Sequence, residues 1–365
     1  MPNHSGMKRM RIAAVVLTVV AVGTMLPAPA TGAAKDMVAA RTKFFGAANV
    51  AADGSVRSDK VILSWFSTSS FAAAFNGHVV FLDAWKIRGS VNNDYVPTTT
   101  KELIALNPEY IFIGHGDFDH AADLGEIAAG TGATVVGSPE HCEIARSQSG
   151  DDSIECVEAA PEGAPPGLRK DLKLLPGVGI SAVTHVHSSV EQYEGDRTPC
   201  PPIWNAQDTL NYPPSPEDLM SMTTWGTTRG ANILYQFRVK DFALTWHDTS
   251  GKIEEDAPEA VKAIESLPQT DVHTGPVLAF GQVTNCMRSL GQYIRALRPQ
   301  IYTPNHHDNF VAVAGDNAKD LEPYVRDEIA RIPKKIRPEL VYTYDPEAYI
   351  RPELFTYKVN DPRWK

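Results

Sequence analysis

Clusters of histidine and aspartate recur along this chain of 365 residues, and each cluster follows a short apolar run. Strand ends converge at one edge of an α/β sheet, so ligands that lie far apart in the sequence can meet there. Imidazole and carboxylate groups together suit zinc, iron or manganese, and clusters without cysteine are compatible with a hydrolytic centre. The candidate ligands are His115, Asp117, Asp119, His120 and Asp123, then His185 and His187, then His247 and Asp248, and finally His306, His307 and Asp308.

A single histidine is more often a helix cap or a surface hydrogen-bonding group than a metal ligand. His115, Asp119 and His120 are different, because they lie within six residues directly after an apolar run. Such a compressed set of ligand types at a strand end favours a metal site over three unrelated structural roles.

The apolar pattern predicts an α/β sandwich. Runs at 61–66, 70–75 and 78–83, the last two joined by an Asn-Gly turn, are typical of consecutive hairpin strands. Farther along, strands alternate with helices, which indicates one layered domain rather than separate domains. The later strands are expected at 110–113, 134–136, 179–187, 231–239, 242–246, within 271–280 and at 301–303, and the helices at 101–106, 121–129, 140–146, 258–267 and 287–297.

The segment IGHGDFDHAAD at 113–123 resembles the HxHxDH signature of the metallo-β-lactamase-fold superfamily. Other motifs follow in the family's order: Asp83 at the end of an early strand, HSS at 187–189, DTSG at 248–251 and PNHHDNF at 304–310. The opening ILSWF at 62–66 and the HSS motif are similar to the ascorbate-phosphate-lactonase-like branch. The resemblance covers about residues 59–315. It implies a four-layer αββα sandwich and a metal-dependent hydrolase.

The resemblance also implies a site for two divalent metal ions. Its first half would be His115, Asp117 and His187, its second half Asp119, His120 and His306, with Asp248 between the metals. His185 and His307 are alternates to His187 and His306, His247 is a candidate supporting group, and His273 is expected to be a buried structural histidine. The family's second His is Asp117 here. A carboxylate gives that half of the site a hard, anionic ligand in place of an imidazole. Zinc is the expected ion, with iron or manganese as alternatives.

The activity that the resemblance implies is attack by a metal-bound hydroxide, with Asp119 as a catalytic group that orients the nucleophile. The branch favours an ester or lactone bond, whereas a β-lactam amide, a phosphodiester and a non-catalytic binding scaffold are the alternatives. The fold alone does not choose among them. The net charge of −10 and the lack of a basic run disfavour nucleic acid, so the expected partner is a small-molecule substrate.

The N-terminus predicts export. Basic residues at 8–11, an apolar run at 12–26 and Ala-Pro-Ala at 28–30 are typical of a signal peptide over 1–30, with Ala33 or Ala34 as alternative cleavage sites. A membrane anchor is the other interpretation, but the apolar run is short for a span, and cleavage would leave no anchor. The mature protein would be secreted or periplasmic and would begin with a loosely ordered lead-in at 31–58, before a domain at 59–365.

Four cysteines in an oxidising compartment favour disulfides, although free cysteines are the alternative. Cys142 with Cys156 is the more local of three connectivities, and it leaves Cys200 with Cys286. A proline-rich and aromatic-rich insertion at 188–230 follows the third motif and is either a substrate lid or a surface flap.

Overall fold

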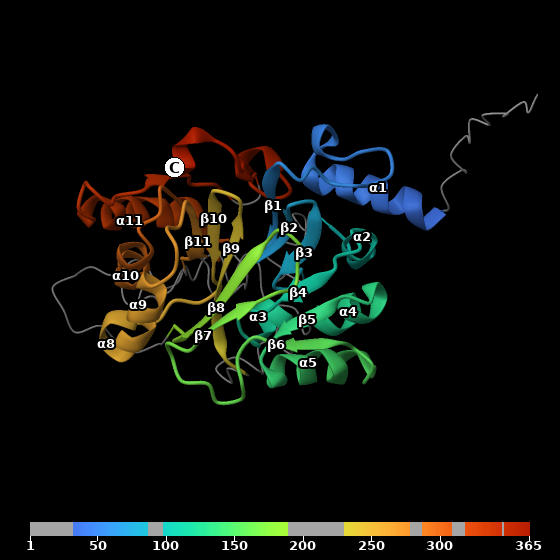
Figure 1. Ribbon diagram of the computed structural model, residues 1–365, viewed down its shortest axis with the longest axis horizontal. Helices are drawn as coiled ribbons and strands as arrows, with labels where there is room; N and C mark the ends of the chain where they lie inside the picture. The colour runs from blue at the N-terminus through green and yellow to red at the C-terminus, as the bar shows by residue number, and fades with distance from the viewer. Residues whose placement is uncertain (1–31, 87–97, 189–229, 278–286, 309–317, 345–346) are drawn as a thin grey trace, which may run out of the picture.

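The computed structural model describes residues 32–86, 98–188, 230–277, 287–308, 318–344 and 347–365. In these residues the strands are β1 (Lys60–Ser67), β2 (Ser70–Phe75), β3 (His78–Leu82), β4 (Tyr110–Phe112), β5 (Thr134–Gly137), β6 (Cys156–Glu158), β7 (Arg169–Leu172), β8 (Gly179–His185), β9 (Asn232–Val239), β10 (Phe242–Trp246), β11 (Val272–Pro276), β12 (Ile301–Asn305), β13 (Glu339–Leu340) and β14 (Thr356–Lys358). They form two seven-stranded sheets, β14-β1-β2-β3-β4-β5-β6 and β13-β12-β11-β10-β9-β8-β7 (Figure 1).

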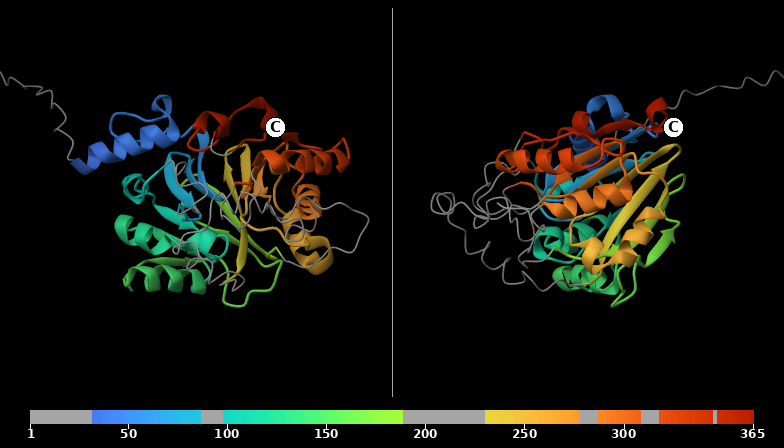
Figure 2. Two further views of the ribbon diagram at one scale, coloured as in Figure 1. Left: turned by 180° about the vertical axis from the view of Figure 1, so that it is seen from behind. Right: turned by 90° about the vertical axis from the view of Figure 1, so that its left-hand side faces the viewer.

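Helices cover the outer faces of both sheets. Figures 1 and 2 show α1, α2, α4 and α5 beside the first sheet and α8, α9, α10 and α11 beside the second. The helices are α1 (Gly32–Phe45), α2 (Thr100–Ala105), α3 (Phe118–Ala121), α4 (Leu124–Thr131), α5 (Pro139–Ser149), α8 (Ile253–Asp256), α9 (Pro258–Glu265), α10 (Arg288–Leu297) and α11 (Ala318–Arg331), with short 3-10 turns at Ala47–Asn49, Pro352–Phe355 and Pro362–Trp364. The layers are helix, sheet, sheet and helix, which confirms the predicted four-layer αββα sandwich.

The layering explains why β1 is buried along almost its whole length. Val61, Leu63 and Trp65 pack between the sheets, whereas Ile62 and Phe66 face the helices. Successive side chains of a strand point to opposite faces, so a strand covered on both sides has no polar face. The hairpin prediction at 70–82 is also confirmed, because Asn76 and Gly77 have φ angles of 52° and 88°, as a two-residue turn requires.

The strand directions bring the candidate ligands to one edge. In the second sheet β10, β11 and β12 are parallel, and β9 is antiparallel to both β8 and β10. In the first sheet β3, β4 and β5 are parallel. The carboxyl ends of β8, β10 and β12 therefore lie at a common edge of the second sheet, where loops can carry functional groups.

The prediction of a loosely ordered lead-in at 31–58 is wrong for the described part of that range. Residues 32–45 form α1, whose Phe44 and Phe45 are buried in the core beneath the first sheet. The Arg41 guanidinium donates to the backbone oxygens of Leu106 and Gly54 at 3.0 and 2.9 Å. The composition suggested a loose segment, but the two aromatic side chains anchor it by burial.

Other predictions fall partly or wholly outside the described residues. The predicted signal peptide, Cys200, Cys286 and nearly all of the 188–230 insertion lie there. Cys142 and Cys156 are described and form a disulfide between α5 and β6, with Cα atoms 6.1 Å apart. Among the helices that the structure describes, none combines the length and apolarity needed to cross a membrane.

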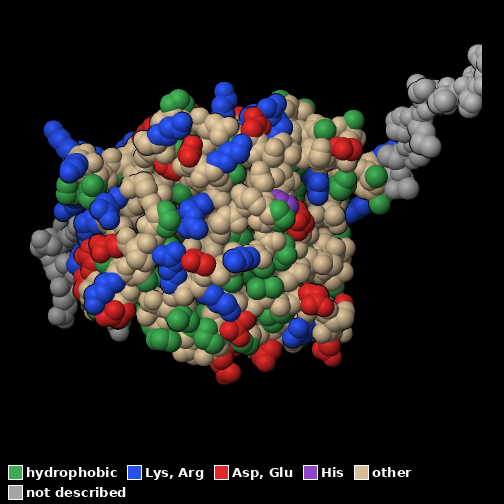
Figure 3. All heavy atoms as spheres, viewed as in Figure 1, with side chains coloured by type: hydrophobic (Ala, Val, Ile, Leu, Met, Phe, Trp, Pro, Cys, Tyr) green, Lys and Arg blue, Asp and Glu red, His purple; other side chains and the backbone are tan. Residues whose placement is uncertain are grey.

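The molecular face seen in Figure 3 carries a mixed charge pattern. Lys and Arg side chains are interspersed there with Asp and Glu rather than gathered in a basic stripe.

Candidate metal centre

Both sheets contribute to one cluster of candidate ligands. His115 follows the end of β4, Asp117 is the N-cap of α3, and Asp119 and His120 lie within α3. The second sheet contributes His187 after β8, Asp248 after β10 and His306 directly after β12. The structure thus brings together all seven residues of the predicted site, in three overlapping groups that could each hold a metal ion.

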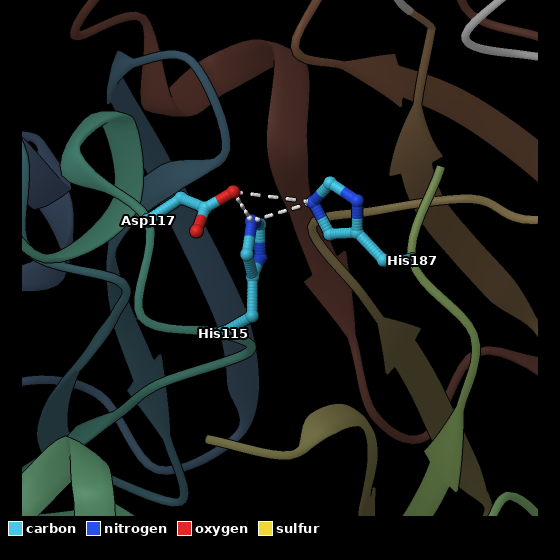
Figure 4. A group of neighbouring side chains, drawn as sticks. All are labelled: His115, Asp117 and His187. Carbon is cyan, nitrogen blue, oxygen red and sulfur yellow. Dashed lines mark hydrogen bonds and ion pairs between the residues drawn. The ribbon is translucent and has the colours of Figure 1, made fainter. Parts of the chain in front are cut away.

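The first group consists of His115, Asp117 and His187 (Figure 4). The two Nε2 atoms are 3.1 Å apart, and Asp117 Oδ2 is 3.5 Å from His115 Nε2 and 3.4 Å from His187 Nε2. The His187 side chain is 27% exposed, whereas His115 and Asp117 are 2% and 3% exposed. The group is therefore reached from solvent on the His187 side.

The second group consists of Asp119, His120 and His306. Here the two Nε2 atoms are 3.2 Å apart, and Asp119 Oδ2 is 3.3 Å from His120 Nε2 and 3.1 Å from His306 Nε2. The ring centroids of His115 and His120 are 4.0 Å apart, so the two groups are immediate neighbours. Asp119, with 10% of its side chain exposed, is the most accessible member of the second group.

Hydrogen-bond partners fix the tautomers in the first group. His115 Nδ1 lies 2.7 Å from Asp248 Oδ2, and His187 Nδ1 lies 2.6 Å from the backbone oxygen of Ser188. Carbonyl and carboxylate oxygens only accept, so Nδ1 donates in both rings. Two neutral rings would then turn Nε2 lone pairs toward each other and toward the Asp117 carboxylate. Such an arrangement is repulsive unless a cation, either a proton or a metal ion, lies between the three atoms.

The second group repeats this pattern. His120 Nδ1 donates to Asp83 Oδ2 at 2.8 Å, and the Ser69 hydroxyl is 2.8 Å from both of those atoms. The neutral His120 ring therefore presents its Nε2 lone pair to His306 Nε2 and to the Asp119 carboxylate. A hydrogen bond from the far nitrogen of an imidazole to a carboxylate is the usual way in which proteins orient a histidine that binds a metal.

Asp248 lies on the Nδ1 side of both rings. Its Oδ2 accepts from His115 Nδ1 and is 3.4 Å from His120 Nδ1, whereas the Nε2 atoms of these rings face the other ligands of their own group. Its Oδ1 is buried and has no hydrogen-bond partner within the described residues. The resemblance implies a position between the metals, and Oδ2 in addition contacts the two rings on their Nδ1 side.

A glycine makes room for this carboxylate. A Cβ atom built on Gly114 would lie 2.1 Å from Asp248 Cγ and 2.2 and 2.3 Å from its two oxygens. Gly114 also links the two sheets, because its amide donates to Asp83 Oδ1 at 3.1 Å and its carbonyl accepts from Ile233 at 2.8 Å. The residue before the first motif histidine therefore has to lack a side chain in this structure.

The electrostatics of the cluster favour added positive charge. Burial is the largest influence on His115 and opposes its charged form, but the Asp248 charge and the hydrogen bonds to Asp117 and Asp248 together raise the pKa of His115 to about 9. Burial likewise opposes a charged His120, yet the neighbouring carboxylates, Asp119 foremost, raise its pKa well above the usual value. Burial alone would raise the pKa of Asp117, but hydrogen bonds from His115 and His187 hold it below its usual value. Asp117, Asp119 and Asp248 thus stay ionised and stabilise cations among the imidazoles, whereas burial and the nearby Asp248 charge raise the pKa of Asp83 to about 7.

The two alternate ligands lie outside these groups. His185 Nδ1 is 2.7 Å from the Tyr293 hydroxyl, and His185 is a member of none of the three groups. His307 Nε2 donates to the Thr343 backbone oxygen at 2.9 Å, and its ring stacks on Trp65. The structure therefore places His187 and His306, rather than the alternates, beside the other candidate ligands.

The remaining polar residues of the motifs support the surrounding backbone. Asp123 accepts from the Lys86 amide at 2.6 Å, next to the loop that follows Asp83. His247 and His273 are both buried, and their Nε2 atoms are 2.8 Å apart. His247 Nδ1 donates to the Thr249 backbone oxygen at 2.7 Å, so His273 Nε2 donates to His247 Nε2. His247 therefore holds the backbone at Thr249, next to Asp248.

Two supporting residues were not predicted from the sequence. Ser69 contacts both His120 and Asp83, and Asn305 Nδ2 donates to the His247 backbone oxygen at 3.0 Å, which ties β12 to the residue before Asp248. The polar run Ser-Thr-Ser-Ser at 67–70, between two apolar strands, was a usable signal for Ser69. The Asn305 contact depends on strand register, which the sequence does not display.

No protein-family model matches the chain. A UPF0173 metal-dependent hydrolase of Pyrobaculum calidifontis is 35% identical over 78 residues, which are 21% of this chain and 32% of that protein. One of Chloroflexus aurantiacus is 43% identical over 60 residues, 16% of this chain and 23% of that protein. The similarity thus spans about a third or less of these curated relatives.

Solved structures align over more of the chain at lower identity. A metallo hydrolase from Ignicoccus hospitalis is 17% identical with a TM-score of 0.49, covering 78% of this chain and 95% of that one. A diiron β-hydroxylase from Streptomyces venezuelae is 11% identical with a TM-score of 0.45, covering 79% of this chain and 54% of that one.

The chain has the metallo-β-lactamase fold. Its two sheets, the helices outside them and the cluster of His and Asp at their common edge are the features that the sequence motifs predicted. The relatives that match part of the chain are named metal-dependent hydrolases.

Proposed function

We propose that this protein is an exported metal-dependent hydrolase that binds two divalent cations and cleaves an ester or lactone bond in a small-molecule substrate. The observation that carries the proposal is the pair of inward-facing imidazole sets. Within each set two Nε2 atoms lie 3.1 or 3.2 Å apart beside an ionised carboxylate. This donor chemistry fits a divalent cation in each set.

His115, Asp117 and His187 would hold one cation, and Asp119, His120 and His306 the other. Asp248 would assist both through the two histidine rings, and its unpartnered Oδ1 leaves a bridging contact available. Bound divalent cations supply an acidified water molecule and a Lewis acid for a carbonyl or phosphoryl oxygen. Zinc fits these ligands, and the carboxylate of Asp117 makes manganese or iron the alternatives.

The side chains prepare the site for such chemistry without further rearrangement. Asp83 and Asp248 hold two rings with Nε2 directed inward, so the ligands are oriented before an ion arrives. The Asp119 carboxylate is the accessible acceptor of the second group and is placed to orient an attacking water molecule. His187 marks the side from which a substrate approaches, because most of the other ligands are buried.

The bond class and the export of the protein are inferred from particular sequence segments. The resemblance of 62–66 and 187–189 to the ascorbate-phosphate-lactonase-like branch favours an ester or lactone. Export rests on the basic, apolar and small-residue segments at 8–30. N-terminal sequencing of the exported protein should find a first residue near Thr31, and a start before Ala28 would contradict cleavage there.

A substrate panel tests the activity. Chromogenic esters, lactones, cephalosporins and phosphodiesters would be incubated with the purified protein, before and after treatment with a chelator and after restoring zinc or manganese. We expect turnover of an ester or lactone that chelation abolishes and metal restores. Hydrolysis of only a cephalosporin or phosphodiester would change the bond class, and metal-independent turnover would contradict the proposed chemistry.

A further inference from the structure

The C-terminal segment, residues 347–365, packs beside the second candidate metal group. Its strand β14 pairs with β1, aligning Lys60 with Lys358 and Ile62 with Thr356. Upstream of β14, the Ile350 amide donates to the Trp65 backbone oxygen at 3.0 Å. This places the segment against the end of β1 that leads into the 68–69 turn.

That turn and the end of β12 share an uncommon backbone conformation. Thr68 and His306 have φ angles of 45° and 57°, in the left-handed region that non-glycine residues seldom adopt. The His306 amide donates to the Thr68 oxygen at 2.8 Å, so each strained residue holds the other. Thr68 is β-branched, which makes this conformation unfavourable unless the surroundings impose it.

Asp308 supplies part of that support. The Thr68 amide donates to Asp308 Oδ2 at 2.8 Å, and the Tyr349 hydroxyl donates to the same oxygen. Trp65 completes the contact, because its Nε1 donates to the Thr68 oxygen at 2.7 Å and its ring lies 4.7 Å from that of Tyr349. All of these side chains are buried.

These contacts form a continuous path from the C-terminal segment to a candidate ligand. Tyr349 contacts Asp308, Asp308 holds the amide of Thr68, and the oxygen of Thr68 holds the amide of His306. His306 is the only member of the second group that β12 carries, so its backbone angle decides where its Nε2 lies relative to Asp119.

We propose that Tyr349 is a positioning residue for the cation site of Asp119, His120 and His306, through which the C-terminal segment sets the affinity of that site. The proposal rests on the proposed function, because it requires this group to bind a metal ion. Tyr349 acts on this group through Asp308 and Thr68, so its effect should be confined to one of two ions.

The test uses Tyr349→Phe in the full-length exported protein. This variant keeps the ring beside Trp65 and removes only the hydroxyl that donates a hydrogen bond to Asp308. Tyr357→Phe is the matched control, because Tyr357 is buried in the same segment and its hydroxyl has no partner within the described residues. Stepwise zinc binding would be measured by competition with a chromophoric chelator, and the ligand geometry by Co²⁺ absorption.

We expect Tyr349→Phe to weaken one of two zinc affinities by about 10- to 100-fold and to alter the Co²⁺ spectrum of that ion, as loss of a supporting hydrogen bond around a ligand does. Tyr357→Phe should bind both ions as the wild type does. In a His306→Ala background, which already lacks the second group, Tyr349→Phe should leave the remaining affinity unchanged. Asp308→Asn is a second variant, and it should likewise weaken the affinity for only one of the two ions.

Three results would overturn the inference. Wild-type binding of both ions by Tyr349→Phe would show that the hydroxyl has no positioning role. Equal weakening of both ions with a lower thermal midpoint would assign Tyr349 to general stability. A further loss of affinity in the His306→Ala background would place its effect elsewhere. Failure of the wild-type protein to bind any ion would instead contradict the proposed function.

Discussion

Gly114→Ala is the substitution whose consequence follows most directly from the geometry. The added Cβ would lie 2.1 Å from Asp248 Cγ, and ordinary contact begins at 3.4 Å, so the carboxylate has to move by about 1.3 Å. Along the bond to His115 Nδ1, that movement lengthens 2.7 Å to about 4 Å, beyond hydrogen-bonding distance. Loss of this bond frees the His115 ring, so metal affinity should fall about 10- to 100-fold.

The overpacking itself should lower the free energy of unfolding by about 1–3 kcal/mol. Gly130→Ala is the control, because its Cβ would approach a side-chain atom of Ile104 to 2.6 Å on the outer helix α4, where a flexible side chain can yield. Metal affinity would be measured by isothermal titration of the metal-free proteins, and unfolding by urea. Unchanged metal affinity in Gly114→Ala would refute the supporting role given to Asp248.

Three further perturbations follow from the same site. Asp119→Ala and His306→Ala should each lose one metal ion and the activity while the circular dichroism of the fold is kept; unchanged turnover would remove that residue from the site. Asp117→His should retain two ions, prefer zinc more strongly and shift the activity optimum to lower pH, because one anionic ligand is lost. Identical metal content and pH profile in the wild type and Asp117→Ala would contradict a role for Asp117 as a ligand. Metal affinity should rise with pH up to about 9, because an incoming ion has to displace the proton that His115 holds below its raised pKa. Titrations in buffers of different ionisation enthalpy would detect the released proton, and binding independent of pH would argue against it.

The motifs predicted which candidate ligands lie close together, but not which residues orient their side chains. Spacing placed His115, Asp119 and His120 after a strand, and the order of the other motifs placed His187 and His306 at the same edge. Such positions follow from strand direction, which short apolar runs reveal. The orientation of a side chain does not follow, so the Nδ1-side contacts of Asp248 required the structure.

The N-terminal and C-terminal segments make long-range contacts that their local sequence does not predict. Alanine-rich composition indicated a loose segment at 31–58, whereas the burial of Phe44 and Phe45 determines that α1 forms. Similarly, the local sequence near Tyr349 does not predict its hydrogen bond to Asp308, which lies 41 residues away in the sequence. Contacts of this kind depend on how distant elements pack, and local propensity is overridden by that packing.

The most direct test of the two-cation site is a crystal structure of the protein grown with zinc or manganese, with anomalous scattering recorded at the metal's absorption edge. Two anomalous peaks are predicted, one among His115, Asp117 and His187 and the other among Asp119, His120 and His306. Absence of a peak from both groups, in a protein whose fold is intact, would contradict the assignment of this cluster as a metal centre.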